Sequence, residues 1–198
     1  MTDLHDSWEK LLNPAVLRAN LIHTSLFIAA FEMFKARVIE KPETFFSTGF
    51  DQNGVIVSDK YKSQVLSRSK SELYASLLWL KEMKAIEDSD MESFDAIRQH
   101  RNELAHELLE FLSDAKREVD IGKFEDLVGL LTKIEKWWFV NFELAIDPEI
   151  MPEGADVDDV IPGPMLILKL MLDIALGSEP EEGYYYNAYR TSANRGVR

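Results

Sequence analysis

The stretch RQHRNELAHELL, residues 98–109, decides how this chain is expected to fold, because it lies in the middle of a long predicted amphipathic helix. Apolar residues in and around it recur at the three- and four-residue spacing of one helical face: Phe94, Ile97, Leu104, Ala105, Leu108 and Leu112. At about 100° per residue, Arg101 falls in the centre of this apolar stripe, where a cation requires a partner. Arg98, Asn102 and His106 are each four residues apart and follow the border of the same stripe.

The run Arg101-Asn102-x-x-x-His106 resembles the arginine, polar residue, spacer and histidine motif of the HEPN superfamily, a group of small helical domains that includes many metal-independent ribonucleases. The Leu-Ala pair before the histidine is typical of the way this motif is embedded. The resemblance covers about residues 13–146. It implies catalytic roles for Arg101 and His106, a supporting role for Asn102, and a composite cleft in which the motif helices of two copies face each other across a two-fold axis.

The reaction implied by this resemblance cleaves RNA through attack of the ribose 2′-hydroxyl on the neighbouring phosphorus, without a metal. A histidine exchanges protons near neutral pH, which suits His106 to act as base or acid. Arg101 stays protonated and presents a planar fork that would stabilise the charged transition state, with Arg98 in support. Because one histidine cannot easily serve on both sides of the phosphorus, we expect a homodimer to supply the second.

Glu32 lies inside an apolar run of the first long helix, and the sequence leaves two interpretations of it open. The carboxylate either reaches the surface or pairs with Lys35, or it is a buried counter-ion for Arg101 and supports the site.

Two alternatives to a ribonuclease remain open from the sequence. A catalytically silent HEPN-like module that binds a nucleotide or a protein fits the same residues, and so does a purely structural polar network at a dimer interface. The ribonuclease hypothesis favours a toxin or phage-defence setting, with an antitoxin as a candidate partner.

Composition limits the classes of protein to which this chain can belong. The 198-residue chain is 46% apolar and 11% aromatic, which predicts a globular domain. It has no cysteine, which excludes disulfides, a thiolate nucleophile and a Cys-based zinc site. It also lacks a Gly-rich phosphate loop and the GxSxG and HExxH motifs. We therefore expect no cofactor and no metal.

The formal net charge of −13 disfavours broad binding of nucleic acid. Residues 137–168 contain no Lys or Arg, so the rest of the chain is less acidic and leaves room for a local RNA-binding pocket. No signal sequence is visible, and the longest apolar runs, residues 21–34 and 164–176, fall short of the roughly 20 residues of a membrane span. We expect a cytoplasmic protein with no membrane segment.

The apolar periodicity predicts an all-α fold, an up-and-down bundle of about five helices in one domain, residues 1–198. Asn13 as N-cap and Pro14 begin the first helix, which is expected to end near Glu40, before Pro42. A small hairpin or an irregular excursion follows, because Asn53-Gly54 is a turn signal. The remaining segments are expected to be helices at about 58–83, 90–119 (with Ser89 and Glu92 as a capping box), 123–146 and 164–177, an acidic loop at 147–163 and a polar tail at 178–198.

Overall fold

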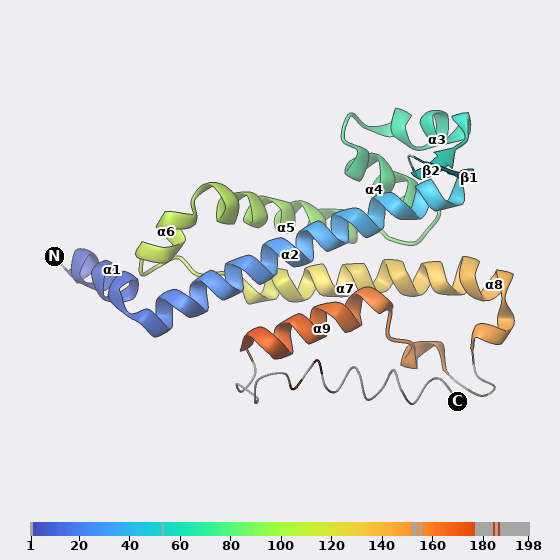
Figure 1. The fold of residues 1–198 in the computed structure, drawn as a ribbon. Helices are drawn as coiled ribbons and strands as arrows, with labels where there is room; N and C mark the ends of the chain where they lie inside the picture. Colours follow the sequence, from blue (N-terminus) through green and yellow to red (C-terminus); the bar gives the residue numbers. More distant parts are fainter. Residues whose placement is uncertain are drawn as a thin grey trace.

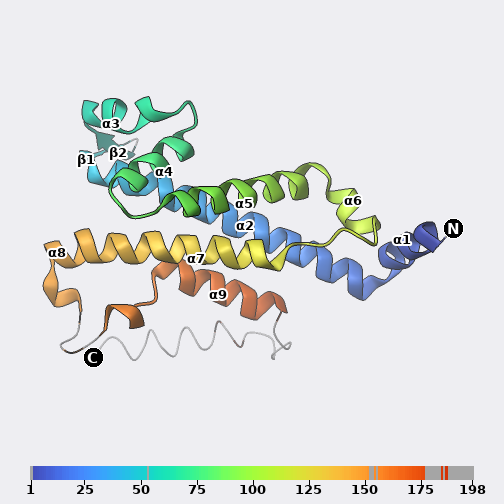
Figure 2. The same cartoon turned by 180° about the vertical axis from the view of Figure 1, so that it is seen from behind.

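The structure, a computed structural model, describes residues 2–52, 54–151, 154, 156–176, 184 and 186 (Figure 1). The helices and strands in chain order are α1 (Thr2–Leu12), α2 (Pro14–Phe45), β1 (Ser47–Asp51), β2 (Gly54–Val57), α3 (Asp59–Gln64), α4 (Glu72–Glu82), α5 (Asp88–His106), α6 (Leu108–Ser113), α7 (Ile121–Trp138), α8 (Leu144–Ile146) and α9 (Gly163–Leu176). α2 and α7 run side by side, with α5 on one side of them and α9 on the other (Figures 1 and 2). The predicted all-α class is confirmed, but the exact bundle of five helices is not.

α2 is the central helix of this arrangement. It contacts α1, α4, α5, α6, α7 and α9, as expected for a helix that is apolar in almost every direction. Phe27, Phe34 and Val38 are fully buried in the core. By length and composition alone, α2 is also long and apolar enough to cross a membrane, a test that core helices of soluble proteins pass as well. The expected cytoplasmic location therefore stays a prediction.

The predicted start of α2 is confirmed and its predicted end is wrong. The Asn13 side chain accepts hydrogen bonds from the backbone N–H groups of residues 15 and 16, and Pro14 is the first helical residue. The helix continues past Pro42 to Phe45, although proline lacks the N–H for the helical hydrogen bond. Contacts of the Phe45 ring with Trp79 and Phe142 hold this last turn against the core.

Of the two predictions for the next segment, the hairpin is confirmed. β1 and β2 pair antiparallel, and Gly54 has a φ of 121°, which favours glycine. Asn53 lies outside the described residues. The helix predicted at 58–83 is instead broken into α3, a 3-10 turn and α4. Ser69 is extended and the Ser71 side chain accepts from the backbone N–H of Tyr74, so local serine hydrogen bonds start a new helix there.

The helix that carries the motif is also shorter than predicted. α5 ends at His106, and Glu107 adopts a non-helical conformation before the short α6. The capping box at its start consists of Glu87 and Asp90 and not of Ser89 and Glu92. Phe111 of α6 is buried in the core, and a non-helical segment then leads to α7, so the expectation of a helix to residue 119 is wrong.

α9 occupies nearly the predicted residues, but it is not enclosed by the fold. Leu168 is its one buried residue, while other apolar side chains of the helix face outward. The acidic segment before it forms two short 3-10 turns, at Pro148–Ile150 and Val157–Asp159. α7 is extended by a π-helical turn at Phe139–Glu143 and by α8, which together match most of the helix predicted at 123–146.

Candidate functional site

A shallow groove of about 560 Å³ follows the exposed face of α5, and three predicted site residues line it. The side chains of Arg98, Asn102 and His106 are exposed and follow one another along the helix, as their four-residue spacing predicts. The other lining residues are Asp95, Ala96, Gln99, Glu103 and Glu107. The structure therefore brings three of the five predicted site residues to one surface.

Arg101 does not line this groove, because its guanidinium lies against α2. Its Nη2 donates a hydrogen bond of 2.6 Å to Oε1 of Glu32, and the guanidinium carbon lies 5.4 Å from the centre of the Phe31 ring. A long hydrogen bond of 3.5 Å from Nη1 to Oδ1 of Asn102 links Arg101 to the groove. The buried Nε has no hydrogen-bond partner among the described residues. A guanidinium has five N–H donors, so Arg101 retains donors for an additional acceptor.

The apolar stripe of α5 is rotated from the one predicted. The buried residues are Phe94, Ile97, His100 and Leu104, whereas Ala105 is exposed and Arg101 is only partly buried. Arg101 therefore lies at the border of the stripe and not at its centre, and that expectation is wrong. The difference arises because His100 packs inward, which turns the next residue toward the edge of α2.

Glu32 satisfies parts of both sequence-based interpretations. Its Oε1 accepts from Arg101, and its Oε2 lies 3.7 Å from Nζ of Lys35. The side chain is 44% exposed and that of Arg101 is 28% exposed, so this is a partly solvated ion pair. The pairing of Glu32 with Arg101, which one of the two interpretations included, is confirmed, but the burial that the same interpretation included is wrong.

His100 is the buried titratable residue of α5, and the sequence-based reasoning did not assign it a role. It is 4% exposed, and its Nε2 accepts a 3.0 Å hydrogen bond from the backbone N–H of Asp120, the N-cap of α7. Its ring packs edge-on against Phe27 and Phe111. Burial, together with the nearby positive charge of Lys123, lowers the pKa of His100. His100 is therefore a neutral acceptor that joins α5 to the start of α7.

The charges around the groove are mixed. Asp95 lies 3.7 Å from Arg98, whose guanidinium also stacks over the ring of Tyr74. Glu107 forms an ion pair with Arg117, and Glu103 accepts a hydrogen bond from the Gln99 side chain. The three carboxylates of the groove therefore already have partners. His106 is the last residue of α5, and its side chain is exposed.

A second site, which the sequence-based reasoning missed, contains a buried cluster of charges. Arg37 donates from Nε and Nη2 to the two oxygens of Glu135, at 2.7 and 3.2 Å. Nζ of Lys41 lies 2.9 Å from the same carboxylate, and the side chains of Lys41 and Glu135 are 5% and 6% exposed. Burial opposes ionisation of Glu135, but the hydrogen bonds from both cations outweigh it and lower the pKa of this carboxyl.

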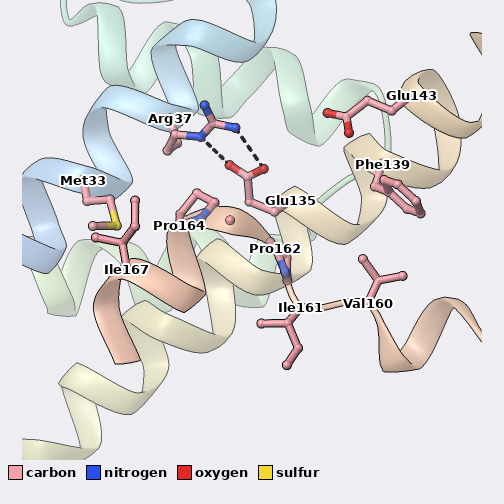
Figure 3. A pocket seen from close by; sticks show the side chains of 11 residues that line it. Met33, Arg37, Glu135, Phe139, Glu143, Val160, Ile161, Pro162, Pro164 and Ile167 are labelled. Carbon is pink, nitrogen blue, oxygen red and sulfur yellow. Dashed lines mark hydrogen bonds and ion pairs between the residues drawn. The ribbon is translucent and has the colours of Figure 1, made fainter. Parts of the chain in front are cut away.

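This cluster borders a cavity of about 550 Å³ under the start of α9. Figure 3 shows Arg37 and Glu135 facing each other above Pro162 and Pro164. The other walls are mainly apolar and come from α2, the π-helical turn, the segment before α9 and α9 itself: Met33, Phe139, Val160, Ile161 and Ile167. The sequence signal that could have found the cluster is Glu135 itself, four residues after Leu131 in the apolar stripe of α7.

Among the described residues, the side chains of His5, Asp6 and Glu9 are close enough to one another to share a metal ion. All three are exposed on α1, and such polar groups are common on protein surfaces. No cofactor or metal role is assigned to them, and none of the five predicted site residues belongs to this group.

Comparisons of the chain with protein-family models, with curated proteins and with solved structures gave no match.

Proposed function

We propose that this protein is a metal-independent endoribonuclease of the HEPN type, with Arg101 and His106 as its catalytic residues. The observation that carries the proposal is the row of Arg98, Asn102 and His106 along one exposed groove, with Arg101 beside it. The long helices α2, α4, α5, α7 and α9 would serve as the bundle that presents this row. The cellular setting would be cytoplasmic growth arrest, in a toxin or phage-defence system, with an antitoxin covering the groove.

The chemistry assigns a role to each side chain. His106 is exposed and can take the proton from the ribose 2′-hydroxyl or deliver one to the leaving 5′-oxygen. Arg101 cannot act as a base, but its remaining N–H donors can bind phosphate oxygens as negative charge develops. Asn102 lies between them, and Arg98 adds a cation at the other end of the row. Glu32 is a positioning residue, since it holds one side of the Arg101 guanidinium.

The test is cleavage of single-stranded RNA by the purified protein in the presence of EDTA. The proposal expects products with 2′,3′-cyclic phosphate ends. His106→Ala and Arg101→Ala should each lower the rate by about two orders of magnitude or more. His5→Ala and Arg18→Ala, which alter an exposed histidine and an exposed arginine away from α5, should cleave as the unaltered protein does. Circular dichroism melting would establish that each variant is folded.

Cleavage that survives both Arg101→Ala and His106→Ala would reject the proposal, because a contaminating nuclease or another site would then be responsible. A second candidate function, a catalytically silent protein-binding module, is favoured by the three carboxylates of the groove: Asp95, Glu103 and Glu107. That candidate predicts no turnover by the unaltered protein in any buffer. RNA degradation by EDTA-treated protein that depends on His106 would exclude it.

A further inference from the structure

A cavity of about 530 Å³ lies between α2, the first half of α7 and the last half of α9, and the proposed function does not use it. Its walls are mostly apolar and include Leu26, Phe124, Val128 and Leu172. Because α9 and α5 lie on opposite sides of α2 and α7 (Figures 1 and 2), this cavity is separate from the α5 groove. Its size and apolar lining are those of cavities that bind small molecules.

Two polar side chains line the cavity, and both are available to a ligand. In the part of the chain that the structure describes, His23 of α2 and Glu125 of α7 form no hydrogen bond and no ion pair. The carboxylates of the α5 groove and of Glu135, in contrast, already have partners. Glu125 therefore keeps its full capacity to accept hydrogen bonds from a molecule in the cavity.

Gly129 leaves open space in the cavity wall. Glycine in the middle of a helix is destabilising relative to alanine. A Cβ atom at Gly129 would lie within 4 Å of no heavy atom of another described element, so close packing does not require a glycine here. Ile121, Glu125 and Gly129 are four residues apart and form one row along the cavity side of α7. A molecule bound to Glu125 would therefore find room one helical turn further along, at Gly129.

The charges of the lining select the head group of the ligand. Among the described residues that line the cavity there is one carboxylate, Glu125, and no lysine or arginine. The neighbouring Lys123 is already paired with Asp120. An ammonium group has three N–H donors and the charge opposite to that of Glu125, and a neutral imidazole at His23 can accept from it as well. The net charge of −13 also favours a cation over an anion.

We propose that this cavity binds a small amphipathic amine, a molecule with an aromatic or aliphatic body and one ammonium group. The ammonium group donates to the carboxylate of Glu125. The body packs between Phe124, Val128 and Leu172 and fills the space at Gly129. Burial of the apolar body supplies most of the affinity, and the charged hydrogen bond fixes the orientation.

This site is independent of the proposed ribonuclease activity. None of the residues that line the cavity belongs to the α5 groove. A protein that cleaves no RNA could still bind the amine, and loss of amine binding would leave the chemistry of Arg101 and His106 untouched.

Isothermal titration calorimetry on the full-length chain tests the proposal with three probes that share one body: phenylbutylamine, phenylbutanol and phenylbutyrate. The amine should bind about tenfold more tightly than the alcohol, because a charged hydrogen bond is stronger than a neutral one. The carboxylate probe should bind most weakly, since its charge repels that of Glu125. Glu125→Gln should reduce the affinity for the amine to that for the alcohol and leave the alcohol unchanged. The matched control Asp126→Asn removes the next carboxylate of α7, which is exposed and outside the cavity, and should change neither affinity.

Substitutions at Gly129 test the apolar part of the site. Gly129→Leu should fill the cavity and abolish binding of the amine and of the alcohol. Its melting temperature should not fall, because leucine favours the helix more than glycine does. Gly129→Ala is the smaller change and secures the test if the leucine variant fails to fold. It should raise the melting temperature and weaken both probes about equally.

Four results would overturn the proposal. The first is that phenylbutylamine does not bind at millimolar concentration. The second is that phenylbutyrate binds as tightly as the amine, or that Glu125→Gln leaves the affinity for the amine unchanged, since either would reject the ammonium site. The third is binding that survives a folded Gly129→Leu variant, which would place it elsewhere. The fourth is binding that appears only after removal of residues 177–198, which would assign the cavity to the chain's own C-terminal segment.

Discussion

Replacing Glu135 with Gln should destabilise the fold strongly, because it removes the carboxylate that neutralises a buried lysine. Nζ of Lys41 lies 2.9 Å from Glu135, and the side chains are 5% and 6% exposed. Glu143, the next carboxylate, is 4.0 Å from the same ammonium and half-exposed. Removing one partner of a buried pair costs about 3–5 kcal/mol. The Gln oxygen still accepts one hydrogen bond, so we expect the free energy of unfolding to decrease by about 3 kcal/mol.

Urea unfolding at neutral pH measures this loss as a difference in the free energy of unfolding. In thermal melts, about 3 kcal/mol corresponds to a decrease of about 6–12 °C for a chain of this size. The matched control is Glu40→Gln, which removes the exposed carboxylate that pairs with Arg37 and should cost less than about 1 kcal/mol. Adding Lys41→Met to Glu135→Gln should recover most of the loss, because no buried ammonium remains. If Glu135→Gln costs no more than Glu40→Gln, the buried-charge reasoning is refuted.

The same loss should depend on pH in a defined direction. The hydrogen bonds from Arg37 and Lys41 hold the pKa of Glu135 below its ordinary value of 4.5, although burial alone would raise it. The unfolded chain therefore binds this proton more readily than the folded chain does. The stability that Glu135 contributes is fully present above about pH 4.5 and is lost as the pH falls. The difference between the unaltered protein and Glu135→Gln should shrink on acidification, and a constant difference would contradict the assignment.

Three further predictions concern α5 and its neighbours. Burial and Lys123 lower the pKa of His100, so the free energy of unfolding should decrease as the pH falls below about 6.5, by at most about 1.4 kcal/mol per pH unit. His100→Gln should remove this pH dependence. If urea unfolding gives the same change of free energy with pH for the variant and the unaltered protein, the prediction is contradicted. Leu104→Ala, at a fully buried position, should cost about 2–5 kcal/mol, and a loss below 1 kcal/mol would show that the site collapses or is solvated. Glu32→Gln should tighten RNA binding by up to about fivefold in a filter-binding assay, since a phosphate no longer competes with the carboxylate for Arg101. Weaker binding would mean that the role of Glu32 in positioning the Arg101 guanidinium outweighs its competition with the phosphate.

Local sequence signals predicted the elements that local hydrogen bonds determine. Asn13 followed by Pro14 predicted the start of α2. The turn signal at Gly54 predicted either a hairpin or an irregular excursion for the segment after α2, and the hairpin is the one observed. Two helix breaks were missed. The break before α4 has a local cause, the hydrogen bonds of the serines at its start, whereas the end of α5 depends on contacts with residues distant in the sequence. Apolar periodicity continues through Glu107, but α5 ends there because His100 bonds to Asp120 and the intervening chain folds back onto the core.

The candidate site also has features that the sequence predicts and features that depend on the packing of distant residues. The need of Arg101 for a partner follows from its place in an apolar region of the helix, and pairing with Arg101 was one of the two interpretations that the sequence left open for Glu32. The rotation of the stripe was not predictable, because periodicity alone does not distinguish a buried His100 from a buried Arg101. The cluster at Glu135 was missed for a different reason: Arg37 and Glu135 are 98 positions apart, and only the packing of α2 against α7 brings them together.

The positions of Arg101 and His106 also bear on where a composite active site would form. Five residues along one helix separate two side chains by about 7.5 Å axially and by about 140° around the axis. Arg101 accordingly lies against α2 while His106 lies in the groove, so one phosphate more readily meets Arg101 of one copy and His106 of another. Mixed dimers of Arg101→Ala and His106→Ala would then contain one intact site, and random exchange should give about a quarter of the unaltered activity. A mixture as inactive as either variant alone would mean that both residues act within one chain.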